Sequence, residues 1–152
     1  MRPTWDEYFA AICQLVATRS TCLKYQVGCV LVKGNQVIAT GYNGVPSGEV
    51  HCTDQGFCRP GVPMCGHGAG SRAIHAEKNA VGQAAKHGVS TEGAIAYCTH
   101  YPCKGCQEVL LAAGVIHTYY LEGFDEYNNQ QHFAQLPISK LSCTNQFASS
   151  PG

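Results

Sequence analysis

The stretch from Ser71 to His87, SRAIHAEKNAVGQAAKH, organises the rest of the chain. Its small and apolar residues recur at helical spacing and Gly88 stands where a helix would end, so we predict a helix over 71–87. His75 and Glu77 lie in the first turn of that helix. Residues two apart do not share a helix face, so these two are poor partners for one ion. A helix start nevertheless has free N–H groups and a positive dipole end, which favour a polar site.

A second group of metal-ligating residues follows in PCKGC, residues 102–106. His75, Cys103 and Cys106 would give zinc three ligands and leave the fourth tetrahedral position open for water, as a catalytic zinc site requires. Glu77 would then be free to move protons. A lone Cys-x-x-Cys can also be a redox pair, and a lone histidine is more often a core or surface residue. The two motifs together, each opening a predicted helix, favour the metal site.

Length and composition set the broad class. The 152 residues fit one domain over 1–152, which can bury an apolar core without disulfides. A formal net charge of zero, with 13% charged residues, argues against a nucleic-acid partner, which usually requires a basic stripe. The start MRPTWDEYFAA lacks an apolar signal core and no long apolar run follows, so we expect a cytoplasmic protein without a membrane partner. Its ten cysteines are then thiols or metal ligands rather than disulfides.

The order of predicted elements indicates an α/β fold. Thr4 to Glu7 is a capping box that opens a helix to about Thr18. Strands are predicted over 27–32, 36–40, 94–99 and 118–121, and further helices over 104–113 and 124–133, with a frayed tail from 137. The first two strands form a hairpin. This order favours a mixed sheet with helices on both faces, on which the two motif-bearing helices lie side by side and bring His75 to the cysteines.

Several segments resemble the deoxycytidylate (dCMP) deaminase family of the zinc-dependent cytidine deaminase superfamily. They are RSTC (19–22), QVG (26–28), TGYNG (40–44), HC (51–52), HAEKNA (75–80) and THYPCKGC (99–106), and the match is densest from Trp5 to Asp125. The H-x-E and P-C-x-x-C pair is shared with tRNA-adenosine and guanine deaminases, which generally lack GYNG. Cytidine deaminases usually carry Cys where His75 stands.

This resemblance implies a fold, a reaction and partners. The fold is the cytidine-deaminase-like α/β/α three-layer sandwich with a mixed sheet. The reaction is dCMP plus water to dUMP plus ammonia, which supplies dUMP for thymidylate synthesis. In that chemistry zinc lowers the pKa of water, the hydroxide attacks C4 of cytosine, and Glu77 carries protons to N3 and to the leaving amine. The resemblance also implies a hexameric homo-oligomer, activation by dCTP, inhibition by dTTP, and Mg²⁺ bound with a nucleotide effector.

The resemblance further implies a set of substrate-binding residues: Asn43, Ala76, Asn79, Lys86 and Phe124. The residues alone leave other readings open. Asn43 could be a turn asparagine in Tyr-Asn-Gly, Asn79 a surface residue of the helix, and Lys86 a solvated lysine that complements the helix dipole. Relatives commonly have tyrosine where Phe124 stands, so a hydroxyl contact with substrate would be lost.

The glycine-rich segment 41–70 is too long for an unsupported loop inside a small domain. A second, structural zinc, as in some members of the family, could order it. The four thiols that would close a tetrahedron around that zinc are Cys22, Cys52, Cys58 and Cys65. His51 or His67 could replace one of them. The insertion at 66–70 departs from the family pattern and could reshape the rim of the site.

Two other functions compete with deamination of a free nucleotide. One is deamination of a nucleic acid, most simply of tRNA adenosine, which the neutral charge and the GYNG segment disfavour. The other is a non-catalytic zinc module linked to DNA uptake, because some relatives are associated with competence genes. The intact Glu77 disfavours that reading.

Overall fold

The computed structural model describes residues 2–22, 25–45, 74–122 and 135–142. Its elements, in chain order, are α1 (Trp5–Ala17), β1 (Gly28–Lys33), β2 (Gln36–Tyr42), α3 (Ala76–Lys86), β3 (Ile95–His100), α4 (Lys104–Ala112), β4 (His117–Glu122) and β5 (Ile138–Lys140). The strands form one sheet in the order β2-β1-β3-β4-β5. None of the helices described is both long and apolar enough to cross a bilayer.

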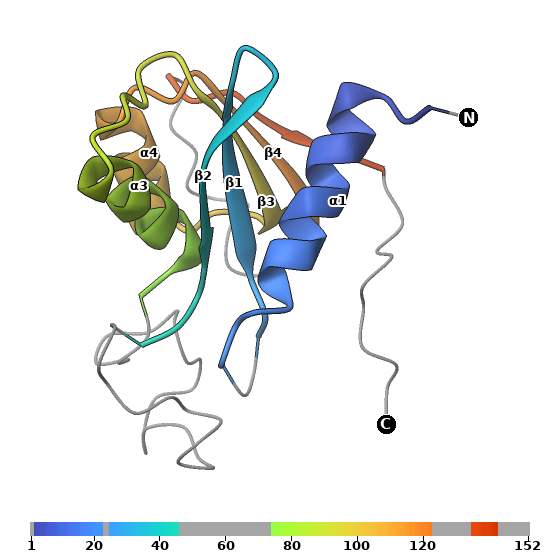
Figure 1. Ribbon diagram of the computed structural model, residues 1–152, viewed down its shortest axis with the longest axis horizontal. Helices are drawn as coiled ribbons and strands as arrows, with labels where there is room; N and C mark the ends of the chain where they lie inside the picture. The colour runs from blue at the N-terminus through green and yellow to red at the C-terminus, as the bar shows by residue number, and fades with distance from the viewer. Residues whose placement is uncertain (1, 23–24, 46–73, 123–134, 143–152) are drawn as a thin grey trace.

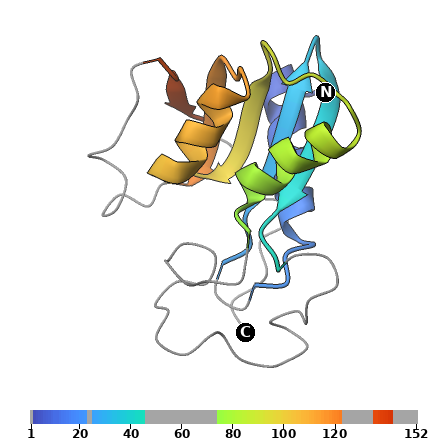
Figure 2. The ribbon, with the colours of Figure 1, turned by 90° about the vertical axis from the view of Figure 1, so that its left-hand side faces the viewer.

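The sheet is mixed and has helices on both faces, which confirms the predicted fold class. β1 is antiparallel to both β2 and β3, whereas β3, β4 and β5 are parallel to one another. Helix α1 covers one face, and α3 and α4 cover the other (Figure 1). Turning the molecule by 90° shows α3 and α4 side by side on that second face (Figure 2).

Strand β1 is buried on both faces, which explains its unbroken apolar sequence. Cys29 and Leu31 point into the core beneath α3 and α4, while Val30 and Val32 point into the core beneath α1. A strand covered on both sides needs no alternation of apolar and polar residues. The predicted buried strand and its hairpin are therefore confirmed, and each predicted strand ends within two residues of the observed one.

Helix α1 begins with the predicted capping box. The Glu7 backbone N–H donates to Thr4 Oγ1, and the Thr4 N–H donates to Glu7 Oε1, both at 3.1 Å. The helix packs closely on β1 because Gly28 has no side chain: a Cβ there would collide with the Cys13 carbonyl oxygen. The six cysteines within the described ranges form no disulfide with one another, and Cys13 and Cys29 are fully buried.

The helix predicted over 71–87 begins later, at Ala76. Ile74 is held in an extended conformation because its N–H donates to the Gly44 carbonyl oxygen at 2.7 Å and its carbonyl accepts the Gly44 N–H at 3.2 Å. His75 is extended as well, with φ −64° and ψ 149°. A backbone pair between residues thirty positions apart thus delays the helix, and helical periodicity does not reveal it.

The C-terminal part also differs from the sequence-based expectation. Ile138–Lys140 form β5, parallel to β4, within the stretch predicted to fray. Leu136, just before this strand, is fully buried in the core beneath α3 and α4. That apolar anchor stabilises a strand of three residues. The helix predicted over 124–133 lies outside the described residues.

Replacing Thr118 with valine should raise the free energy of unfolding by about 1 kcal/mol. Thr118 is fully buried on β4, and its Oγ1 has no hydrogen-bond partner among the described residues. A methyl group of the same shape removes the desolvation penalty of an unpaired hydroxyl. Urea unfolding monitored by circular dichroism measures the change.

Thr99→Val is the matched control for that substitution. Thr99 is also buried, but its Oγ1 accepts the Gly28 N–H at 3.0 Å. Its valine variant should lose about 1–2 kcal/mol, because the Gly28 donor is left unpaired. Equal destabilisation by the two substitutions would mean that the Thr118 hydroxyl has a partner.

Candidate active site

The candidate site lies where α3 and α4 begin. His75 is the N-cap residue of α3, Cys103 is the N-cap of α4, and Cys106 follows in the first turn of α4. N-cap positions favour Ser, Thr, Asp or Asn, whose side chains accept a backbone hydrogen bond. Neither His75 nor Cys103 makes such a bond. Both side chains contribute to a shared cluster instead, as the sequence predicts.

The cluster has the spacing of a metal site. His75 Nδ1 lies 3.2 Å from Cys106 Sγ and 3.5 Å from Cys103 Sγ, and the three ligand atoms lie within 4.8 Å of one another. Neighbouring N and S ligands of tetrahedral zinc are about 3.6 Å apart, given the usual Zn–N and Zn–S bond lengths. The donor set and its spacing therefore fit zinc, with one position left for another ligand.

The two cysteines of the cluster form one hydrogen-bonded pair. The pKa of Cys103 falls to about 3, because the Cys106 thiol donates a hydrogen bond to the Cys103 sulfur and because His75 lies beside that sulfur. The pKa of Cys106 is raised because it keeps the proton of that bond, and burial and the Glu77 charge act in the same direction. The positive ends of two helix dipoles also favour a thiolate here. A divalent cation would displace the remaining proton.

Glu77 is the buried carboxyl beside this cluster. It is the second residue of α3 and is only 4% exposed. Burial raises its pKa, although its own backbone N–H, the Cys106 thiol and the charge of His75 act in the opposite direction. A buried carboxyl with a raised pKa is suited to holding and releasing a proton.

The start of α3 is held in place by its close approach to β2. A Cβ at Gly41 would collide with the Ala76 carbonyl oxygen and the Ala80 backbone nitrogen. Ala76, Ala80 and Ala84 form a row of small residues along α3, and all three are almost fully buried in the core. Their small side chains let the helix lie directly on the sheet, so the position of His75 and Glu77 is set by packing.

Sequence reasoning missed the role of Gln107. This residue of α4 is fully buried, and its Nε2 donates to the Pro102 carbonyl oxygen at 2.9 Å. The bond anchors the turn that leads into Cys103. One sequence signal could have indicated its burial: Gln107 lies one helical turn before Leu110, on the apolar side of the predicted helix.

The Asn43 side chain is buried and makes three hydrogen bonds within the protein. Its Oδ1 accepts the Val27 N–H at 2.8 Å and the Ser20 hydroxyl at 2.6 Å, and its Nδ2 donates to the Tyr25 carbonyl oxygen at 2.8 Å. The side chain is 1% exposed. It ties the end of β2 to the segment before β1, so its predicted contact with substrate would compete with these bonds.

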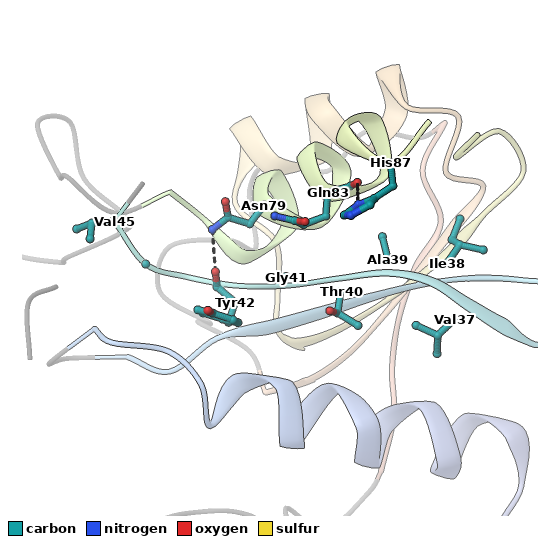
Figure 3. Close-up of a pocket in the computed structure, with 11 residues that line it drawn as sticks. Val37, Ile38, Ala39, Thr40, Gly41, Tyr42, Val45, Asn79, Gln83 and His87 are labelled. Carbon is teal, nitrogen blue, oxygen red and sulfur yellow. Dashed lines mark hydrogen bonds between the residues drawn. The ribbon is translucent and has the colours of Figure 1, made fainter. Parts of the chain in front are cut away.

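The other predicted site residues are scattered. Asn79 lines a pocket of about 610 Å³ between β2 and α3 and donates to the Tyr42 carbonyl oxygen at 2.8 Å (Figure 3). Ala76 is buried, and Lys86 is exposed at the far end of α3. Lys86 lies nine positions after Glu77, which is about 13 Å along the helix axis. The described residues that line this pocket do not include His75, Cys103 or Cys106.

The predicted second cluster is described at one residue. Cys22 is 3% exposed and its Sγ accepts the Tyr25 N–H at 3.5 Å. Cys52, Cys58, Cys65 and Phe124 lie outside the described residues. The second zinc site therefore stays a prediction.

Comparisons with known sequences agree with the motifs. Residues 3–122 match the family described as the cytidine and deoxycytidylate deaminase zinc-binding region. ComE operon protein 2 of Bacillus subtilis (strain 168) is 44% identical over 139 residues, which cover 91% of this chain and 70% of that protein. Deoxycytidylate deaminase of Schizosaccharomyces pombe is 41% identical over 137 residues, 89% of this chain but 41% of the yeast protein. The chain thus spans less than half of that longer relative.

Comparison with solved structures supports the same fold. The dCMP deaminase of cyanophage S-TIM5, in complex with dCMP and dUMP, aligns with a TM-score of 0.72 at 28% identity. The alignment covers 93% of this chain and 99% of the phage chain. The two chains therefore share the same overall fold over nearly their whole length.

Gly41→Ala should displace the start of α3 and lower the free energy of unfolding by about 1–3 kcal/mol, because the new methyl group meets backbone atoms that cannot rotate away. The matched control, Gly82→Ala on α3, has open space around its Cβ and should stabilise the helix by up to about 1 kcal/mol. Thermal and urea unfolding measure both changes. A neutral Gly41→Ala would show that α3 does not depend on this contact.

Proposed function

The chain belongs to the cytidine and deoxycytidylate deaminase family, and from this we propose that it hydrolyses dCMP to dUMP and ammonia. The observation that carries the proposal is the close group of His75, Cys103 and Cys106 beside the buried Glu77 carboxyl. Relatives named deoxycytidylate deaminase and the phage enzyme bound to dCMP and dUMP support the choice of substrate. Because the chain spans only part of the fungal relatives, the activity of the whole protein belongs to the proposal.

In this mechanism His75, Cys103 and Cys106 would hold zinc, which would supply a nucleophile near neutral pH by lowering the pKa of water. Glu77 accepts a proton from the attacking water and passes it to N3 of cytosine. It then carries the second proton of that water to the amino nitrogen at C4, so that the C4–N bond breaks, ammonia leaves and the C4 carbonyl forms. Because the carboxyl is buried, it exchanges protons with the bound base rather than with bulk water. The Gly41 contact and the Gln107 bond keep the two helix starts in register for this transfer.

A free nucleotide fits the chain better than a nucleic acid. Binding to tRNA depends largely on neutralising phosphates with Lys and Arg, and the formal net charge here is zero. Ammonia release measured with dCMP, cytidine, dCTP and tRNA separates these substrates. We expect turnover of dCMP and no salt-dependent binding of tRNA, whereas a steep salt dependence would favour deamination of tRNA adenosine.

The remaining consequences of family membership are part of the same proposal. The protein would be a cytoplasmic homo-oligomer, and by resemblance a hexamer. It would be activated by dCTP and inhibited by dTTP, with Mg²⁺ bound beside the nucleotide effector. Its product, dUMP, would supply thymidylate synthesis. We also propose a structural zinc held by Cys22, Cys52, Cys58 and Cys65. The buried position of Cys22 supports it, since a ligand shielded from water suits a closed site.

Glu77→Gln should keep the fold and the zinc but lower turnover of dCMP by at least about a hundredfold, because only the proton carrier is removed. Steady-state ammonia release measures the rate, and elemental analysis checks the metal. Glu108→Gln makes the same chemical change at an exposed position of α4 and should leave the rate unchanged. Near-normal turnover in Glu77→Gln would assign the proton transfer to another group.

Elemental analysis of the purified chain should find two zinc ions, one in each proposed site. His75→Ala should remove one zinc and abolish activity, whereas Cys52→Ser should remove the other and lower the melting temperature, since metal binding there is coupled to folding. Cys143→Ser is the control that should retain both ions. One zinc per chain, unchanged in Cys52→Ser, would exclude the structural site and leave the catalytic one intact.

A further inference from the structure

Among the residues that the structure describes, strand β2 is an edge of the sheet. β1 is its neighbour on one side, and the pocket between β2 and α3 lies along the other (Figure 3). Asn79 donates to the Tyr42 carbonyl oxygen from α3, so that carbonyl points outward from the edge. In an antiparallel ladder the backbone groups of alternate residues point to the same side, which directs the N–H and C=O of Thr40 outward too. The Tyr42 carbonyl is already bonded to Asn79, so Thr40 is the residue whose outward N–H and C=O can pair with a further strand.

Helix α3 supplies a matching row of polar side chains. Asn79, Gln83 and His87 are spaced at i, i+4 and i+8 and line the pocket from the helix side (Figure 3). Asn79 lies at Tyr42, and four residues of helix rise about as far as two residues of strand, roughly 6 Å. Gln83 is therefore level with Thr40, at the middle of the groove.

We propose that this edge is an interface with a second copy of the chain, in which β2 pairs antiparallel with β2 of the partner. The two-fold axis would pass near Thr40 and Gln83. An axis of this kind pairs each residue with its own counterpart or with one equally distant from the axis. Thr40 would exchange two backbone hydrogen bonds with the partner's Thr40, and the Gln83 amide, a donor and an acceptor, would pair with the partner's Gln83.

The chemistry of the groove favours a copy of itself over a charged ligand. The described residues that line it are Val37, Ile38, Ala39, Thr40, Gly41, Tyr42, Gly44, Val45, Asn79, Gln83 and His87, and none of these is Lys, Arg, Asp or Glu. These described residues offer a phosphate no Lys or Arg, and through them two copies would meet without the repulsion of like charges on opposed strands. The same lining presents backbone and carboxamide groups that suit another edge strand.

The packing leaves room for this pairing. Ala39 and Gly41 are the β2 residues beneath α3, and their small side chains keep the helix close to its own strand. Two helices that each lie on an edge strand would then meet across the axis at about the 8–10 Å typical of packed helices. A register shift opposite Leu31 and Val32 interrupts the ladder near Ile38, so the regular edge runs from Ala39 to Tyr42. This inference uses none of the residues proposed to hold zinc.

Introducing a positive or a negative charge at Gln83 tests the symmetry directly. Gln83→Lys and Gln83→Glu should each weaken self-association at least about tenfold in sedimentation equilibrium of the full chain, because each new charge meets its own copy. A one-to-one mixture of the two variants should associate again, since Lys then meets Glu. If the parent chain forms a larger oligomer that also uses other interfaces, each single variant should form an oligomer of half the parent mass. The one-to-one mixture should then restore the parent mass.

The controls separate the interface from folding. Ala85→Lys adds the same charge to an exposed position on the other side of α3 and should associate like the parent chain. Thr40→Pro, which edge strands tolerate, removes the N–H offered to the partner and should weaken association as well. Circular dichroism confirms that each variant is folded. The proposal is wrong if the parent chain is monomeric at about 100 µM, if neither Gln83 variant weakens association, or if their mixture fails to recover.

Discussion

The arrangement depends on two helices that begin side by side. The first-turn N–H groups of α3 and α4 and the positive ends of their dipoles converge on one point, where negative charge is favoured. Cys103, Cys106 and Glu77 place three ionisable acids at that point, and His75 completes the cluster. Neither helix has a side-chain capping bond, so negative charge at the site stabilises the two helix starts instead.

That convergence requires close packing behind it. Gly41 and the alanine row of α3 let the helix rest on the sheet, and Gln107 holds the turn before Cys103. A larger side chain at Gly41 would move His75 away from the cysteines. The apolar core beneath α3 and α4 is therefore part of the site, because it fixes distances that zinc ligands must keep within a few tenths of an ångström.

The structure also separates residues that one family pattern groups together. Asn43 is engaged in three hydrogen bonds that tie the end of β2 to the segment before β1. Asn79 fixes the edge of β2 through Tyr42, and Lys86 lies at the far end of α3. The Asn43 and Asn79 amides therefore hold parts of the scaffold around the site.

The sequence by itself determined the fold class, and it identified the three residues that the structure groups as a possible metal site. The ligand types and their placement before helical patterns identify His75, Cys103 and Cys106, and an unbroken apolar run identifies the buried strand. Only the tertiary structure decided where α3 begins, that Ile138–Lys140 pair with β4, and that Gln107 and Asn43 are buried anchors. The reason is physical: these features rest on hydrogen bonds and packing between distant segments, and local periodicity carries no record of them.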